Sequence, residues 1–172
     1  MAEPAAKHAK RTDNHRNPSF LIAFVLIAFI IAADQWVKSI IRTTFTVGES
    51  HPVIPNVFHI TYVQNTGAAF SMFRDSKVMT VLLPAVLIVV CGYAMYRFYK
   101  AKQTCPMICM AMVIGGGIGN MIDRLAQGFV VDMIDFRVFP VFNVADIAVT
   151  CGCALLFVWV LFIDGRKEKD GN

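Results

Sequence analysis

The sequence predicts an all-α membrane protein with four transmembrane helices. Of its 172 residues, 56% are hydrophobic and only 16% are charged, which is too apolar for an ordinary water-soluble domain. Four stretches, each close to the roughly 20 apolar residues that a bilayer requires, are separated by loops. The length is that of one domain, so we expect a single unit over residues 18–164 between polar tails at 1–17 and 165–172.

The first span is expected over about 18–38. It consists of the apolar run Phe20–Ala33 and continues past Asp34, which should lie near its outer end. The basic residues before it also fit a cleavable signal peptide. However, no A-x-A cleavage site follows the run and three more spans come after it, so we expect this segment to stay in the membrane.

The loop expected at about 39–77 has strand character. Apolar and polar residues alternate over 58–63. The segment before this stretch contains the turn-forming residues Gly48, Pro52 and Pro55. Alternation with a period of two predicts a β-strand with one buried face.

The other spans are expected over about 78–97, 104–122 and 142–163, with a loop at about 123–141. Pro106 lies where a first helical turn tolerates proline. Four glycines in the third span predict close approach of a neighbouring helix or of a substrate chain: Gly115, Gly116, Gly117 and Gly119. In the fourth span, Asp146 needs a partner or a water-filled cavity, because an ionisable group costs a few kcal/mol at bilayer depth.

The basic residues predict the orientation. Ten fall on the side of the two termini: Lys7, Lys10, Arg11, Arg16, Arg97, Lys100, Lys102, Arg166, Lys167 and Lys169. Six are spread over the longer loops of the other side: Lys38, Arg42, Arg74, Lys77, Arg124 and Arg137. The positive-inside rule therefore places both termini in the cytoplasm. The basic tails are only a weak indication of nucleic-acid binding, and we expect none.

Neither the cysteines nor the histidines form a metal or disulfide pattern. The cysteines are odd in number and lie in apolar segments: Cys91, Cys105, Cys109, Cys151 and Cys153. The histidines are scattered without an H-E-x-x-H motif: His8, His15, His51 and His59. We expect the thiols to pack as small apolar groups and expect no metal or cofactor.

Aspartates are the best candidates for chemistry. With this topology five of them gather near the outer membrane surface: Asp34, Asp123, Asp132, Asp135 and Asp146. That side offers no credible Ser-His or Cys-His pair. Two aspartates held close together share one proton and can act as base and acid on a water molecule, as in an aspartyl protease. The pattern by itself does not say which two.

Five blocks in order resemble the lipoprotein signal peptidase (signal peptidase II) family. They are Asp34–Lys38 (DQWVK), Asn65–Ser71 (NTGAAFS), Gly116–Arg124 (GGIGNMIDR), Val130–Asp132 (VVD) and Phe142–Asp146 (FNVAD). The resemblance implies four spans with a small extracytoplasmic β-rich cradle, in the bacterial cytoplasmic membrane. It implies an aspartic endopeptidase that removes the signal peptide from diacylglyceryl-modified prolipoproteins, cutting just before the lipidated cysteine.

The resemblance also implies roles for individual residues. The catalytic pair would be Asp132 and Asp146. Substrate-positioning or supporting groups would be Asp34, Lys38, Asn65, Gly67, Asn120, Arg124 and Asn143. Membrane lipid would surround the site, and a monomer is assumed because the sequence leaves the oligomeric state open.

Plainer interpretations stand beside these roles. Asn143 precedes the last span, where a helix cap is about as well supported. Asp34 and Lys38 are spaced i, i+4 and predict an intrahelical ion pair. Asp123 is expected to pair with its neighbour Arg124.

Three further expectations concern the surroundings of the site. Asp135 is expected in a solvated loop. Trp36 and Phe70 are more typical of interfacial anchors than of a substrate entry.

Two other functions are compatible with an apolar chain carrying intramembrane carboxylates. One is a small proton-coupled carrier in which Asp34 and Asp146 relay protons, although these residues crowd one face rather than the midplane. The other is a non-catalytic lipid-binding or scaffold protein. The sequence does not identify the lipoproteins processed or whether the host has one membrane or two.

Overall fold

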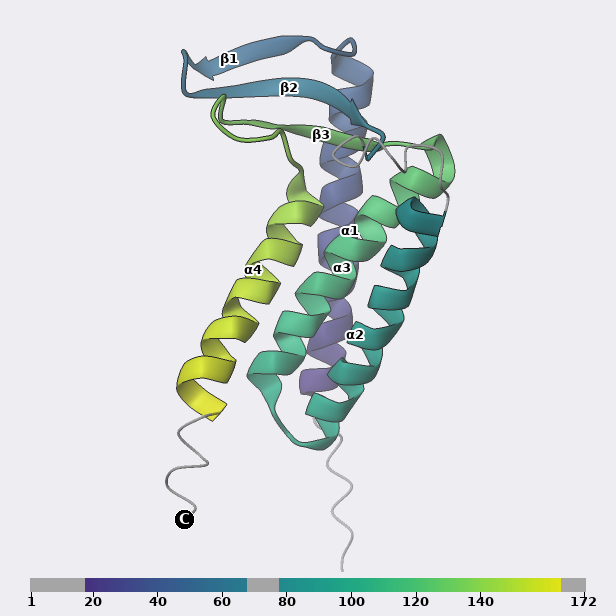
Figure 1. Ribbon diagram of the computed structural model, residues 1–172, viewed down its shortest axis with the longest axis vertical. Coiled ribbons are helices and arrows are strands. Elements are labelled where there is room, and N and C mark those ends of the chain that lie inside the picture. Colours follow the sequence, from purple (N-terminus) through teal and green to yellow (C-terminus); the bar gives the residue numbers. More distant parts are fainter. Residues whose placement is uncertain (1–17, 68–77, 165–172) are drawn as a thin grey trace, which may run out of the picture.

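Four helices form a bundle with a small sheet laid across one end (Figure 1). This arrangement comes from a computed structural model, which describes residues 18–67 and 78–164. The helices and strands follow the chain in the order α1 (Ser19–Thr44), β1 (Ser50–Ile54), β2 (Phe58–Asn65), α2 (Leu83–Lys100), α3 (Thr104–Gln127), β3 (Val130–Asp135) and α4 (Val144–Trp159). Turns of π-helix precede α2 at Val78–Leu82 and follow α4 at Val160–Asp164.

Four helical stretches are long and apolar enough to cross a membrane: Ser19–Thr44, Thr80–Lys100, Thr104–Gln127 and Val144–Phe162. The 26 residues of α1 extend over about 39 Å, more than the roughly 30 Å of a bilayer core. Large apolar side chains such as Leu21, Val89 and Phe157 are exposed on α1, α2 and α4, as a lipid-facing surface requires. These helices and the sheet confirm the predicted fold class.

The central helix is α3, which packs against α1, α2 and α4. Its glycines make this close packing feasible. A Cβ at Gly116 would overlap the carbonyl oxygen of Ala145 in α4, and a Cβ at Gly119 would lie 2.7 Å from Oδ2 of Asp34 in α1. The predicted close approach at these glycines is therefore present.

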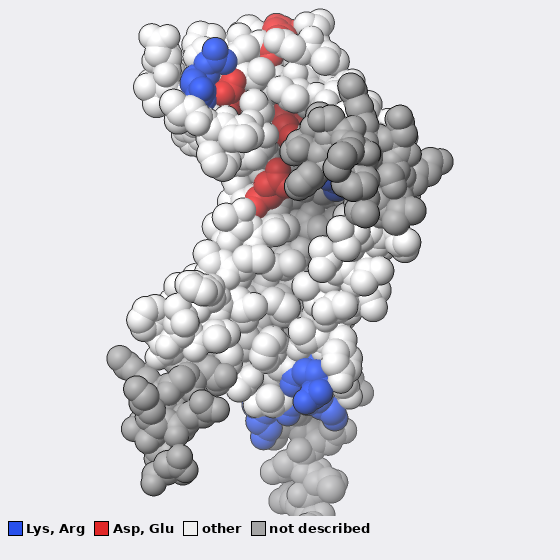
Figure 2. All heavy atoms as spheres, in the orientation of Figure 1, with Lys and Arg blue, Asp and Glu red and all other residues white. Residues whose placement is uncertain are grey.

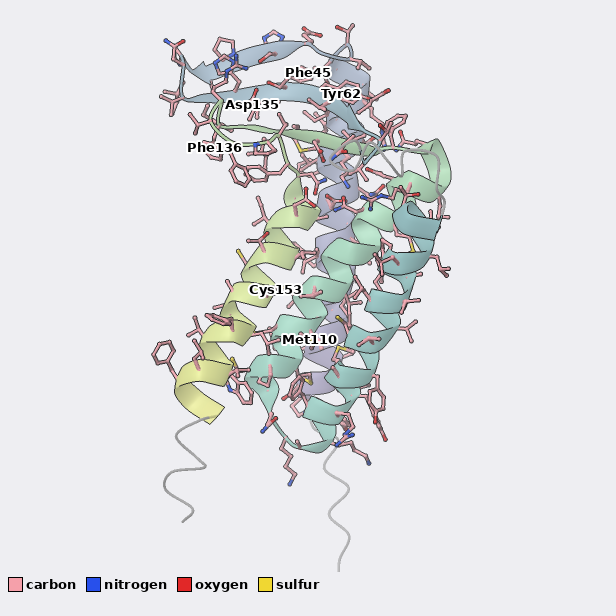
Figure 3. The ribbon with its side chains drawn as sticks, viewed as in Figure 1. Phe45, Tyr62, Met110, Asp135, Phe136 and Cys153 are labelled. Carbon is pink, nitrogen blue, oxygen red and sulfur yellow. The ribbon has the colours of Figure 1, made fainter. Side chains whose placement is uncertain are left out.

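The sheet is antiparallel throughout, in the order β1, β2, β3. The β2–β3 register pairs Val63 with Asp132, beyond an irregularity between Ile60 and Val63. Ile41, near the end of α1, packs with Tyr62 and Met133 beneath the sheet. Figure 3 shows Tyr62 at the sheet and Met110 deep in the bundle, where a second apolar core joins the helices.

Two helices are longer than the sequence predicted. The first continues to Thr44 instead of ending near residue 38, and the third continues to Gln127 instead of ending near residue 122. Both extensions carry charges that compensate each other, because Nη1 of Arg42 lies 3.6 Å from Oδ1 of Asp123. At the C-terminal end of α3, Gly128 adopts a left-handed conformation (φ +82°) that ends the helix.

The other helix boundaries also differ from the expected spans. α2 extends three residues beyond the expected end at 97, and α4 starts at Val144 instead of residue 142 because Asn143 caps it. The expected tails at 1–17 and 165–172 and the stretch Ala68–Ser71, with Phe70, lie outside the described residues.

Candidate active site

Asp132 lies in the middle of β3 with its side chain turned towards the helices. Only 2% of its surface is exposed. The side-chain amide of Asn65, the last residue of β2, donates to Oδ2 of Asp132 at 2.9 Å. The Asn65 oxygen in turn accepts the backbone N–H of Gly67, which has a φ of +81°. This tight turn fixes which atom of the Asn65 amide faces Asp132.

Asp146 lies in the first turn of α4 and is joined to Asp132 through Asn143. The Asn143 side-chain oxygen accepts the Asp146 backbone N–H at 2.9 Å, and Oδ2 of Asp146 accepts the Asn143 backbone N–H at 3.2 Å. These two bonds form a capping box at the start of α4. The Nδ2 atom of Asn143 donates to Oδ1 of Asp132 at 2.7 Å. Asn143 is therefore both the helix cap and the link between two carboxylates, so the two interpretations of this residue do not compete.

Asn120 of α3 supplies the fourth donor to this pair. Its Nδ2 donates to Oδ1 of Asp146 at 2.7 Å, while its Oδ1 accepts from Nδ2 of Asn143 at 3.0 Å. Each oxygen of Asp132 and of Asp146 therefore accepts one N–H. Such donors favour ionised carboxylates, because a carboxylate oxygen accepts more strongly than a carboxylic acid.

Burial acts in the opposite direction on Asp132. Loss of solvent raises the pKa of Asp132 to about 6, although the hydrogen bonds from Asn65 and Asn143 oppose the change. The negative charge of Asp146 raises it further. One carboxyl of the pair thus keeps its proton at a higher pH than a free aspartic acid does.

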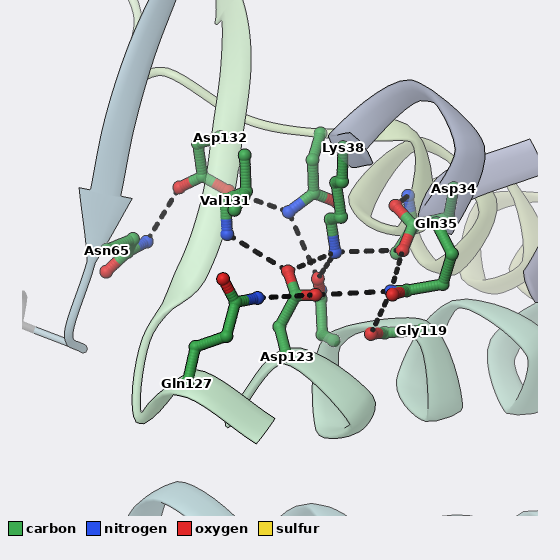
Figure 4. A network of polar contacts seen from close by, with 12 residues as sticks. Asp34, Gln35, Lys38, Asn65, Gly119, Asp123, Gln127, Val131 and Asp132 are labelled. Atoms are coloured by element: carbon green, nitrogen blue, oxygen red, sulfur yellow. Dashed lines mark hydrogen bonds and ion pairs between the residues drawn. The ribbon is translucent and has the colours of Figure 1, made fainter. Parts of the chain in front are cut away.

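A buried ion cluster lies behind these carboxylates (Figure 4). Lys38 of α1 is fully buried, and its Nζ lies 2.8 Å from Asp34 and 3.0 Å from Asp123, both also fully buried. Asp34 accepts the backbone N–H of Ala145, and Asp123 accepts that of Val131. The cluster therefore ties α1 and α3 to the start of α4 and to β3, and the predicted Asp34–Lys38 ion pair is present.

Asp123 does not pair with Arg124 as the sequence predicted. Consecutive residues on a helix point in different directions, and Asp123 faces Lys38 and Arg42 of α1. Arg124 is partly buried, and the carboxylates that act on its guanidinium are, strongest first, Asp146, Asp132 and Asp123.

Gln35 was not singled out from the sequence. Its Nε2 lies within hydrogen-bond distance of three acceptors, which are Oδ2 of Asp34, the Gly119 carbonyl and Oδ1 of Asp123. An uncharged polar residue directly after Asp34 in an apolar span was the signal that could have identified it.

Other expected residues lie away from the pair. Asp135 is 5% exposed at the end of β3, so the expectation of a solvated position was wrong. The Arg137 backbone N–H, followed by the Thr61 hydroxyl, lowers the pKa of Asp135, and these contacts hold the sheet and its turn. Trp36 is 68% exposed on the surface of α1.

The thiols differ in their environments. Cys109 is buried, whereas Cys105, Cys151 and Cys153 are exposed on the helices. Within residues 18–67 and 78–164, no three His, Cys, Asp or Glu side chains lie together as metal ligands.

A pocket of about 580 Å³ opens beside Asp146. It lies between residues 139–142 and the first two turns of α4, and Asp146 and Thr150 are the polar side chains in a largely apolar wall. Figure 2 shows the molecule hollowed between the sheet and the bundle, with Asp and Glu atoms on the inner wall. One carboxylate of the pair is thus accessible from an apolar recess.

Comparisons with known proteins agree with this architecture. The solved structure of a bacterial membrane enzyme, determined by the in meso method at 2.3 Å resolution, is 30% identical with a TM-score of 0.75 and covers 85% of this chain and 91% of its own. The protein is thus a multi-pass bacterial membrane protein with the fold of a membrane enzyme.

Sequence comparisons are more specific. The family model for signal peptidase (SPase) II matches residues 26–162. The lipoprotein signal peptidase of Halothermothrix orenii is 37% identical over 153 residues, which is 88% of this chain and 100% of that protein. The lipoprotein signal peptidase of Moorella thermoacetica is 41% identical over 148 residues, or 86% of this chain and 98% of the other. The chain belongs to the signal peptidase II family and is a membrane protease; the alternative of a proton-coupled carrier is not supported.

Proposed function

We propose that this protease removes the signal peptide from diacylglyceryl-modified prolipoproteins, cutting just before the lipidated cysteine, with Asp132 and Asp146 as the catalytic pair. The observation that carries the proposal is the direct connection of both carboxylates to one residue, Asn143, whose side-chain Nδ2 donates to Asp132 and whose backbone N–H donates to Asp146. Their common contact holds them near each other, with one facing a recess and the other almost fully buried.

The chemistry follows from a pair that shares one proton. The ionised carboxylate takes a proton from water as the water oxygen attacks the scissile carbonyl carbon. The protonated carboxyl gives its proton to the carbonyl oxygen, which forms a neutral tetrahedral diol. Collapse of the diol breaks the C–N bond. The proton first taken from water passes to the leaving amine, and a diol hydroxyl returns its proton to the second carboxyl, so the pair is restored.

The apolar recess supports a lipid-linked substrate. Acyl chains that remain in the bilayer bring the scissile peptide to the membrane surface, and apolar residues beside the cut can occupy the pocket next to Asp146. The relatives named lipoprotein signal peptidase support the same substrate class. Arg124 is suited to hold a peptide carbonyl near the pair, since the charges of both carboxylates act on its guanidinium.

The remaining residues position the pair. Asn65, Asn120 and Asn143 direct N–H groups at the carboxylates, and Gly67 fixes the orientation of Asn65. Asp34 and Lys38 belong to the cluster behind Asn120. All of these residues come from one chain, so a monomer suffices.

Charge distribution supports an active site on the extracytoplasmic face. In Figure 2, the Lys and Arg atoms at the end of the bundle opposite the sheet lie where α2 ends and α3 begins. Arg97, Lys100 and Lys102 occupy that stretch. By the positive-inside rule this end faces the cytoplasm, together with both termini, and the sheet faces outwards.

The test is complementation of a bacterial strain that lacks its own lipoprotein signal peptidase. Asp132→Asn and Asp146→Asn should each abolish processing, with a loss of at least about 100-fold as prolipoprotein size is followed on a gel. Asp135→Asn is the matched control, because Asp135 lies on the same strand as Asp132 but contacts neither member of the pair. Processing by either dyad variant at the wild-type rate, with normal membrane insertion, would refute the assignment.

A further inference from the structure

Lys38 makes more contacts than charge compensation requires. Its ammonium group is fully buried and carries three N–H donors, and three acceptors surround it. Two are the carboxylates of Asp34 at 2.8 Å and Asp123 at 3.0 Å. The third is a neutral atom, Oδ1 of Asn120, at 2.8 Å. This third contact connects the ion cluster to the proposed catalytic pair.

The contact determines which way the Asn120 amide points. Its Oδ1 faces two groups that only donate, Nζ of Lys38 and Nδ2 of Asn143. The Asn143 amide is itself fixed, since its oxygen accepts the Asp146 backbone N–H. Reversing Asn120 would set its NH₂ group against two donors, so its Nδ2 must face Asp146.

The two carboxylates are then in unequal surroundings. Asp146 accepts Nδ2 of Asn120 and lies in the first turn of α4, where the helix dipole favours negative charge. Asp132 has no helix terminus of its own and is almost fully buried in β3.

The charged groups around the pair are few. Arg124 of α3 acts on both carboxylates, and Lys38 of α1 acts on Asp132 directly and reaches Asp146 through Asn120. Behind Lys38, the charges of Asp34 and Asp123 face Lys38 and Arg42. Each carboxylate accepts two N–H donors, so the helix terminus and the smaller burial of its side chain set Asp146 apart from Asp132.

We propose that Lys38 is a positioning residue that holds the Asn120 amide on Asp146, so that Asp146 is the ionised member that takes the proton from water and Asp132 is the member that keeps its proton. This inference rests on the proposed catalytic pair and assigns a separate role to each member. Lys38 touches neither substrate nor the reacting atoms, and it reaches Asp146 through Asn120.

The test is the pH profile of kcat/KM for the purified full chain, with a diacylglyceryl-modified prolipoprotein as substrate. The double variant Lys38→Met/Asp34→Asn removes one positive and one negative charge together, and it leaves Arg42 to face Asp123. An asparagine at 34 can still accept the Ala145 N–H. Without Lys38 the Asn120 oxygen keeps only one of its two donors, Nδ2 of Asn143, so the amide is held less firmly on Asp146. The acidic limb of the profile should therefore move to higher pH by up to about one unit, because the hydrogen bond that favours ionised Asp146 is weakened.

Asn120→Asp provides a second and independent variant. It retains an acceptor for Lys38 and leaves the ion cluster intact, but it presents an oxygen to Asp146 in place of an N–H. The acidic limb should again move to higher pH. This substitution tests the contact through which Lys38 would act, so a profile that matches the wild type would overturn the proposal even if the double variant does not fold.

Arg42→Gln is the matched control. Arg42 lies one turn beyond Lys38 on α1 and contacts the same carboxylate of Asp123, but it has no contact with Asn120. This variant should lower stability without moving the profile. Profiles of the double variant and of Asn120→Asp that match the wild type after scaling would overturn the role of Lys38. Failure of the proposed pair is distinct from this result, because Asp132→Asn or Asp146→Asn would then retain activity at every pH.

Discussion

The Nδ2 atom of Asn143 donates to Oδ1 of Asp132 across 2.7 Å, so the residue that caps α4 also holds a carboxylate of the neighbouring strand. The cap needs the oxygen of this amide and Asp132 needs its nitrogen. Asparagine presents both atoms from one planar group, whereas serine and aspartate, which cap helices equally well, present only oxygen.

Substitutions at Asn143 should therefore separate stability from activity. Asn143→Ala should lower the free energy of unfolding by about 1 kcal/mol through loss of the cap, whereas Asn143→Ser should retain most of it. Both variants should lose processing, because neither carries the side-chain amide N–H that donates to Asp132. Thermal unfolding in detergent and the gel assay measure the two effects, and a serine variant with full activity would contradict the role given to the Nδ2 atom.

The stability of the protein should depend on pH through Asp132. Its pKa is raised from 3.8 to about 6 by burial, so the unfolded chain ionises first as the pH rises. Asp132 therefore contributes on the order of 3 kcal/mol to the free energy of unfolding below pH 3.8, and this contribution is lost as the pH rises to about 6.

Comparison with Asp132→Asn isolates this effect. The pKa of Asp135 is lowered mainly by the Arg137 backbone N–H, and that of Glu49 is lowered to about 2 mainly by the Thr46 backbone N–H. The stabilising contributions of both groups decrease as the pH falls, but they are the same in the wild type and in Asp132→Asn. The variant should gain stability relative to the wild type between pH 4 and about 6.5 in denaturant titrations. A difference that stays constant over this range would argue against a raised pKa.

The glycines of the bundle offer a matched pair of substitutions. Gly116→Ala should lower the free energy of unfolding by about 1–3 kcal/mol, since the new methyl group meets the Ala145 carbonyl and forces α3 from α4. Gly92→Ala adds the same methyl group where nothing lies within 4 Å and should leave stability unchanged or slightly higher. Thermal unfolding checks both, and equal effects at the two positions would show that the α3–α4 contact is not close-packed.

Asp123→Asn should destabilise the protein without removing a catalytic group. Lys38 would lose one of its two buried counterions, and removing one partner of a buried ion pair costs roughly 3 kcal/mol or more. The fraction that folds should still process prolipoprotein. A variant that is stable but inactive would instead place Asp123 in the catalytic pair.

Much of the fold follows from local patterns in the sequence. Long apolar stretches predict the helices, and alternation over 58–63 predicts β2, because these signals report burial or lipid contact residue by residue. The ends of α1 and α3 did not follow from hydropathy. Arg42 and Asp123 look like loop residues until α1 and α3 are packed together and the two charges meet.

The candidate site could likewise be predicted only in part. Clustering of aspartates at one membrane face is a consequence of topology, whereas the choice of Asp132 and Asp146 came from resemblance. The hydrogen-bond partners of the two carboxylates do not follow from the sequence, because they depend on how the helices pack. Asn120 accepts a hydrogen bond from Lys38 of α1 and donates one to Asp146 of α4. Both bonds depend on the rotation of α3 about its axis relative to α1 and α4. No spacing rule encodes that rotation.

The i, i+4 placement of Asp34 and Lys38 also bears on how the protein is made. Helices enter the membrane in chain order, so the first meets lipid before the third has been synthesised. Either charge alone would cost roughly 2.5 to 3.5 kcal/mol at mid-bilayer depth on insertion scales. Bonded at 2.8 Å within one helix, the two form a neutral pair during biogenesis, and Asp123 joins them when the third helix arrives.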